Sequence, residues 1–223
     1  IENYRKVLAE NVVPFVSECA IMGPCSLQGL TRMFPKDKIW PINEYWSDRL
    51  MDNPYSAVLM DFPTREKRYA EFLYGECKNV RDFIAKGMTA HAETLRAEIE
   101  YARFNKDKCG GFMNWMYSDI WPSATWAVVD YYLEPKQAYY QMKKSYAPVL
   151  LTYVDTKDGL NLALINDTQK ILTAKITYGE KTLDGRVLYS EFIDATVEGG
   201  NVFGKIVNRE MQEKNSYLFA EAV

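Results

Sequence analysis

The sequence predicts a mixed chain, with an α/β segment over residues 1–147 and an all-β segment over residues 148–223. Three observations favour this division. The first segment holds two short apolar runs, each followed by a stretch with helical spacing of its apolar residues. The second holds six short alternating runs separated by turn dipeptides. The composition also changes near Pro148, because Trp, Met and Tyr are frequent before it and strand-like runs follow it.

Length and charge limit the class of protein. The chain has 223 residues, 48% of them hydrophobic, which suits a substantial core and is unlike a disordered protein. With 27 Lys and Arg against 30 Asp and Glu, the net charge is −3, whereas a general nucleic-acid binder carries a basic surplus. No stretch approaches the roughly 20 apolar residues of a membrane span. We therefore expect neither nucleic acid nor a membrane as a partner. Because the chain begins at Ile1, we expect a processed product or a piece of a larger protein.

The elements of the first segment alternate between strand and helix. Residues 11–17 form an apolar run that ends at Glu18, the size of a buried strand. Helical spacing then covers residues 79–105. A second short strand is predicted at 112–116, and a second helix at 124–144 with an interruption before its proline.

A long stretch separates the first strand from the first helix. It spans roughly 45 residues, contains several prolines, and is predicted as a loop. Ordinary connections are about 4–6 residues long, and much longer ones are commonly functional.

The second segment reads as an antiparallel sandwich. Turn dipeptides such as Asp158-Gly159, Asp184-Gly185 and Gly199-Gly200 separate its runs. Short strands at this spacing are typical of sandwiches. The predicted strands are 149–154, 160–165, 171–179, 186–193, 201–207 and 216–222.

The first segment is incomplete as a fold. Two parallel strands leave bare edges and an uncovered core, whereas parallel sheets are normally buried on both faces. We therefore expect the last segments of an eight-stranded (β/α)8 TIM barrel, which needs about 250 residues. Functional groups in such barrels lie where strands end at the carboxyl face. The strand ends here fall at Glu18 and between Trp115 and Asp119.

The cysteines do not define a metal site. Cys19, Cys25, Cys77 and Cys109 form no C-x-x-C pair, and the single His91 leaves too few nitrogen ligands for zinc. Free buried thiols are the simpler interpretation, and one or two disulfides remain an alternative.

Several sequence blocks resemble glycoside hydrolase family 2, especially its β-mannosidase and exo-β-D-glucosaminidase branches. Residues 15–18 (FVSE) are similar to the Phe-x-Ser-Glu block of that family. Residues 111–122 (GFMNWMYSDIWP) are similar to its Trp-Gln-Leu-Asn-Asp-x-Trp-Pro block. Further blocks resemble the exit from the family's barrel into its next domain, namely Trp126, Asp130-Tyr131-Tyr132, Pro135-Lys136, Ala138-Tyr139-Tyr140 and Ala147-Pro148-Val149.

The resemblance implies a retaining, exo-acting β-glycosidase that hydrolyses terminal β-mannoside or β-glucosaminide residues. The fold it implies is the end of the barrel, over residues 1–147, followed by an immunoglobulin-like sandwich over 148–223. Glu18 matches the nucleophile that ends the seventh barrel strand. Trp115 matches the aromatic platform that ends the eighth. The expected partners are a carbohydrate substrate and the remaining N-terminal domains of the same enzyme, with no cofactor and no metal.

Three further residues are candidates for substrate binding. Asp119 and Trp121 follow Trp115 in the second block, and Trp46 lies in the long stretch after the first strand. Each has a simpler alternative, because Asp119 also suits a loop cap and the tryptophans also suit packing.

The acid/base glutamate that the family requires is not found at a matching place in this chain. In the family it closes an Asn-Glu pair upstream of the nucleophile, whereas Asn43-Glu44 lies downstream of Glu18. We therefore expect this chain to be inactive alone.

Departures from the family pattern leave a second hypothesis open. Cys19 and Ala20 stand where family β-mannosidases usually have an aromatic residue and a glycine. A non-catalytic glycan-binding or scaffold protein that keeps the family 2 fold is therefore the alternative. The sugar, the oligomeric state and the compartment (bacterial periplasmic, secreted or cytoplasmic) are not determined by the sequence.

Overall fold

A computed structural model describes residues 12–49, 62–207 and 210–223. The chain divides into two compact units that alternate along the sequence. Within the described ranges, the first unit comprises Phe15–Arg96 and Gly111–Lys143. The second comprises Ala97–Gly110 and Lys144–Val223, together with residues 12–14. The boundary predicted near residue 147 divides the chain only once, whereas the two units alternate along it.

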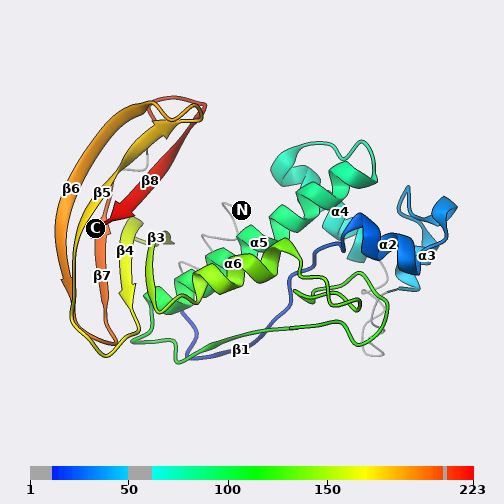
Figure 1. The fold of residues 1–223 in the computed structure, drawn as a ribbon, viewed down its shortest axis with the longest axis horizontal. Helices are drawn as coiled ribbons and strands as arrows, with labels where there is room; N and C mark the ends of the chain where they lie inside the picture. The colour runs from blue at the N-terminus through cyan, green and yellow to red at the C-terminus, as the bar shows by residue number, and fades with distance from the viewer. Residues whose placement is uncertain (1–11, 50–61, 208–209) are drawn as a thin grey trace. The chain divides into compact units, whose positions relative to one another are not determined.

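The first unit combines helices with a short parallel sheet (Figure 1). Two of its helices, α5 and α6, continue into the second unit. Its elements in chain order are β1 (Val16–Cys19), α2 (Leu27–Met33), the 3₁₀ helix η1 (Lys36–Lys38), α3 (Glu44–Ser47), α4 (Phe62–Tyr74), α5 (Val80–Phe104), β2 (Phe112–Asn114) and α6 (Gln137–Ser145).

The strands β1 and β2 pair in parallel, as the strand-helix-strand pattern predicts. Val16 lies opposite Phe112, and Cys19 lies opposite Asn114. The first strand begins later than predicted and extends past Glu18, and residue 11 of the predicted run lies outside the described residues. The second is shorter than predicted, because the chain leaves the sheet after Asn114.

The long stretch after β1 is not a plain loop, and that prediction was wrong where the structure describes it. It contains α2, η1 and α3, while residues 50–61 lie outside the described ranges. Ser26 begins α2 by accepting a hydrogen bond from the Gly29 N–H, and Asn43 begins α3 by accepting one from the Tyr45 N–H. Such side-chain caps stabilise helices too short to show a hydrophobic periodicity.

The helix predicted at 124–144 is mostly absent, whereas α5 confirms the helix predicted at 79–105. Before α6 the chain forms turns and isolated bridges. Asp130 explains part of this, because its Oδ1 accepts hydrogen bonds from the N–H groups of Tyr132 and Glu134. Leu133 also adopts a left-handed conformation with φ of 64°. A carboxylate that binds its own backbone competes with helix formation.

The second unit contains all six predicted strands, arranged as two three-stranded antiparallel sheets (Figure 1). One sheet has the order β3-β4-β7 and the other β6-β5-β8. Inward side chains of β4, β5 and β6 share one apolar cluster, which includes Leu162, Ile176 and Val197. The strands are β3 (Val149–Thr156), β4 (Gly159–Asn166), β5 (Leu172–Thr182), β6 (Val187–Val197), β7 (Val202–Ile206) and β8 (Ser216–Ala222).

Candidate active site

Glu18 and Trp115 lie at the carboxyl ends of the two paired parallel strands. The Trp115 N–H donates a hydrogen bond to the Cys19 carbonyl at 2.8 Å, so the residue after β2 is attached to the residue after Glu18. Both side chains are exposed, and Trp115 retains 43% of its surface. The structure therefore brings together the two residues that the resemblance singled out.

Cys19 is a neutral neighbour of Glu18. The pKa of its thiol is raised to about 12, first by burial and then by the negative charge of Glu18. Thiolates, and not thiols, are the nucleophilic form of cysteine. The Cys19 thiol is therefore not suited to nucleophilic attack near neutral pH. None of the four cysteines forms a disulfide, so the disulfide alternative does not hold in this structure.

A glycine allows the two strands to approach each other closely. The Val16 N–H donates to the Gly111 carbonyl at 2.9 Å. A Cβ atom on Gly111 would lie 2.5 Å from the Phe15 ring, which is closer than real Cβ contacts. The aromatic residue before β1 thus occupies the space that a side chain before β2 would need.

Asp119 lies inside the loop that follows Trp115, with only 6% of its surface exposed. Its Oδ1 accepts hydrogen bonds from the hydroxyl groups of Ser123 and Thr125. Burial raises the pKa of the carboxyl group, while Lys136 and the two hydroxyl groups oppose this effect. Asp119 therefore organises the loop, as its simpler interpretation predicts, and we do not retain it as a sugar ligand.

The two remaining tryptophans differ in their surroundings. Trp121 is half-buried and stays a candidate for substrate contact. Trp46 is 1% exposed, its indole N–H donates to the Ile39 carbonyl at 3.1 Å, and its ring packs against Phe34 and Phe83. The prediction of a substrate role for Trp46 was wrong, because its ring has no free face for a sugar.

A buried polar cluster in the first unit escaped the sequence analysis. We call Lys136, Glu66, His91, Asp119 and Asp130 the Lys136 cluster; their exposed fractions are all 6% or less. Burial raises the pKa of Glu66 to about 8, and Lys136 opposes that rise. Burial, followed by the charge of Lys136, lowers the pKa of His91 well below its ordinary value. His91 is thus a neutral core residue, and Lys136 is the cation of the cluster.

The segment after β1 is packed tightly on α5. A Cβ atom on Gly23 would lie 2.2 Å from Nδ1 of His91, and one on Gly87 would lie 2.8 Å from the ring of Pro24. Glycine is therefore required at both places for the chain after Glu18 to lie against the helix.

Gly23→Ala is expected to destabilise the protein by about 2 kcal/mol, the usual size of an overpacking effect. The added methyl group must displace the buried His91 ring. A lower apparent Tm of the full-length protein would measure the effect. Gly110→Ala is the matched control, because its Cβ would meet the Pro14 carbonyl at an ordinary 3.6 Å. Equal Tm values for the two variants would contradict the prediction.

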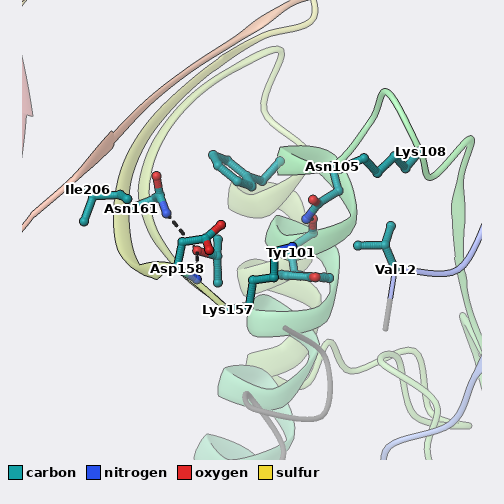
Figure 2. A pocket seen from close by; sticks show the side chains of 10 residues that line it. Val12, Tyr101, Asn105, Lys108, Lys157, Asp158, Asn161 and Ile206 are labelled. Atoms are coloured by element: carbon teal, nitrogen blue, oxygen red, sulfur yellow. Dashed lines mark hydrogen bonds between the residues drawn. The ribbon is translucent and has the colours of Figure 1, made fainter. Parts of the chain in front are cut away.

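A pocket of about 430 Å³ lies within the second unit (Figure 2). The end of α5 contributes Tyr101 and Asn105 to it, and the turn between β3 and β4 contributes Lys157 and Asp158. None of the predicted site residues lines this pocket, which is thus separate from the candidate active site.

The described residues contain neither a candidate metal-binding group nor a candidate membrane-spanning helix. No group of three or more His, Cys, Asp or Glu side chains there is placed to hold a metal ion. Of the helices in the same ranges, none has the length and apolar character needed to span a membrane.

Known proteins share both the sequence and the fold of this chain. β-Mannosidase B of Aspergillus niger is 30% identical over 116 residues, which cover 48% of this chain and 14% of that protein. Exo-β-D-glucosaminidase of Amycolatopsis orientalis is 32% identical over 123 residues, which cover 52% of this chain and 12% of that protein. The relatives and the solved structures that this chain resembles are glycoside hydrolases of family 2. This confirms the resemblance that the motifs indicated.

The likeness in fold to solved structures covers nearly the whole chain. A β-D-mannosidase from Dictyoglomus thermophilum matches with a TM-score of 0.85 at 18% identity, covering 98% of this chain and 26% of that one. The exo-chitosanase of Amycolatopsis orientalis matches with a TM-score of 0.74 at 22% identity, covering 92% of this chain and 25% of that one. At these identities the match shows the fold alone. No protein-family model matches the chain.

Proposed function

We propose that this chain is the part of a retaining, exo-acting β-glycosidase that supplies its catalytic nucleophile. In this proposal residues 1–147 are the end of a (β/α)8 barrel, and residues 148–223 are the immunoglobulin-like sandwich that follows it. The substrates are terminal β-mannosides or β-glucosaminides. The chain spans about a quarter of the solved structures and about one-seventh or less of the curated relatives that it matches. The activity is therefore a property proposed for the whole protein.

The adjacency of Glu18 and Trp115 carries the proposal. They are exposed, and they occupy the carboxyl ends of neighbouring parallel strands, joined by the hydrogen bond from Trp115 N–H to Cys19 O. In (β/α)8 barrels, the carboxyl ends of the strands are where active sites form. A carboxylate and an indole at that position suit a sugar ring, since the indole contacts apolar C–H groups and excludes water.

Retaining hydrolysis needs two carboxyl groups about 5–5.5 Å apart. The Glu18 carboxylate attacks the anomeric carbon and forms a C–O bond while the bond to the leaving oxygen breaks. A second carboxyl group gives its proton to the leaving oxygen, and we propose that another part of the protein supplies it. That group then takes a proton from water, and the water oxygen displaces Glu18 and regenerates the carboxylate.

Covalent trapping tests the proposal directly. The full-length protein would first be assayed on aryl β-mannoside and aryl β-glucosaminide substrates. The 5-fluoro glycosyl fluoride of the preferred sugar should then accumulate as a covalent adduct, and peptide mass spectrometry should locate the sugar on Glu18.

Other results would contradict the proposal in distinct ways. A label on a different carboxylate would remove Glu18 from the nucleophile role. Product that forms with inverted configuration would remove the retaining mechanism. Binding of both glycosides without any turnover would favour the glycan-binding alternative.

A further inference from the structure

Two separate segments follow the strands of the candidate active site. A buried ammonium group joins them, alongside direct hydrogen bonds from the Gly23 N–H to the Thr125 carbonyl at 3.5 Å and from the Cys25 thiol to the Ser123 carbonyl at 3.3 Å. Gly23 lies five residues after Glu18, and Thr125 lies ten residues after Trp115. Lys136 Nζ donates a hydrogen bond of 2.8 Å to the Gly23 carbonyl and another of 2.8 Å to the Thr125 carbonyl.

Lys136 is itself held rigidly. It is 2% exposed, and its backbone N–H donates to the Val128 carbonyl at 2.9 Å. Its own carbonyl accepts from the Tyr139 N–H at 3.1 Å, next to the first turn of α6. The ammonium group therefore projects from a hydrogen-bonded backbone into the protein interior, where a hydrogen bond from a charged donor is stronger than in water.

We propose that Lys136 is a positioning residue for the glycosidase reaction. Its ammonium group ties the segment after the nucleophile to the segment after the aromatic platform, and so maintains the placement of Glu18 relative to Trp115. This inference rests on the proposed function. A misplacement of about 1 Å in an active site can reduce turnover about 100-fold, so a residue that touches no substrate can control kcat.

Lys136→Met in the full-length protein removes the ammonium group and keeps most of the apolar stem. We expect kcat to fall about 30-fold or more, with KM changed less than about threefold, since the surfaces that bind sugar remain. Lys136→Arg keeps a cation and should recover part of kcat. If the Met variant does not fold, the test is the comparison of kcat and KM between the Arg variant and the wild-type protein.

Lys86→Met is a matched control in the same unit. Lys86 Nζ also donates to two backbone carbonyl groups, those of Gly75 and Glu76, but it joins the ends of α4 and α5. This variant loses the same kind of contact away from Glu18 and should retain its kcat.

Hydrogen exchange separates failure of this inference from failure of the proposed function. Lys136→Met should speed amide exchange in peptides covering 19–25 and 115–125, and Lys86→Met should speed it around residues 75–76. This exchange pattern is measurable even if the wild-type protein hydrolyses no glycoside. A lack of hydrolysis together with this pattern would overturn the proposed function alone. An active wild-type protein whose Lys136→Met variant keeps its kcat and its exchange pattern would overturn the positioning role alone.

Discussion

Glu18→Gln in the full-length protein should reduce turnover of the aryl β-glycoside by about a thousandfold or more. The amide keeps the size of the side chain but cannot form the glycosyl-enzyme bond at a useful rate. Such a loss corresponds to about 4 kcal/mol of transition-state stabilisation. Steady-state kinetics would measure it, and circular dichroism and apparent Tm should be unchanged, since Glu18 is exposed at the end of a strand.

Glu76→Gln provides the matched control for this prediction. Glu76 is also exposed, and it lies in the connection between α4 and α5 and not at a strand end. Its variant should keep full activity. If Glu18→Gln retained more than a few per cent of turnover, Glu18 would not be the nucleophile.

Glu66→Gln should make the protein more stable at alkaline pH. The pKa of Glu66 is about 8 in the folded protein against an ordinary value of 4.5, because burial disfavours the carboxylate. Between these values the folded state keeps a proton that the unfolded state releases, so the free energy of unfolding falls as pH rises. The stability is fully present below about pH 4.5 and is lost as pH rises towards 8. The full difference is on the order of 5 kcal/mol.

Apparent Tm measured from pH 5 to pH 9 would test this expectation. Wild type and Glu66→Gln should have similar Tm values at pH 5, and the variant should be higher by several degrees at pH 9. Glu71→Gln on the same helix should behave in the opposite way. Hydrogen bonds from Lys67 and from the Cys77 N–H lower the pKa of Glu71, so its carboxylate stabilises the fold above its ordinary pKa. Parallel curves for wild type and Glu66→Gln would contradict the pKa assignment.

Elements with strong local patterns were predicted well from the sequence. The helix α5 has a long periodic apolar face. The six strands of the second unit are alternating runs that turn dipeptides separate. Each of these patterns reflects a local period that folding leaves unchanged. The short helices α2 and α3 lack such a period and depend on single caps at Ser26 and Asn43, so they were missed.

The candidate site residues also divide into those that a local sequence pattern indicates and those that it does not. Glu18 and Trp115 were proposed from the sequence because each belongs to a distinctive sequence block. Trp46 was assigned wrongly because the local sequence of a proline-rich stretch is the same whether its indole faces solvent or the core. Lys136 was not predicted as a site residue, since nothing in its sequence context indicates a buried ammonium group.

The amino-acid sequence by itself determined the two kinds of secondary structure, the family that the chain resembles and the two candidate residues at the strand ends. The tertiary structure alone decided which side chains are buried, how the two units alternate along the chain, and which cation joins the segments behind those strand ends. The physical reason is distance along the chain. Lys136 is 113 residues from Gly23, and a hydrogen bond between them leaves no local pattern in either segment.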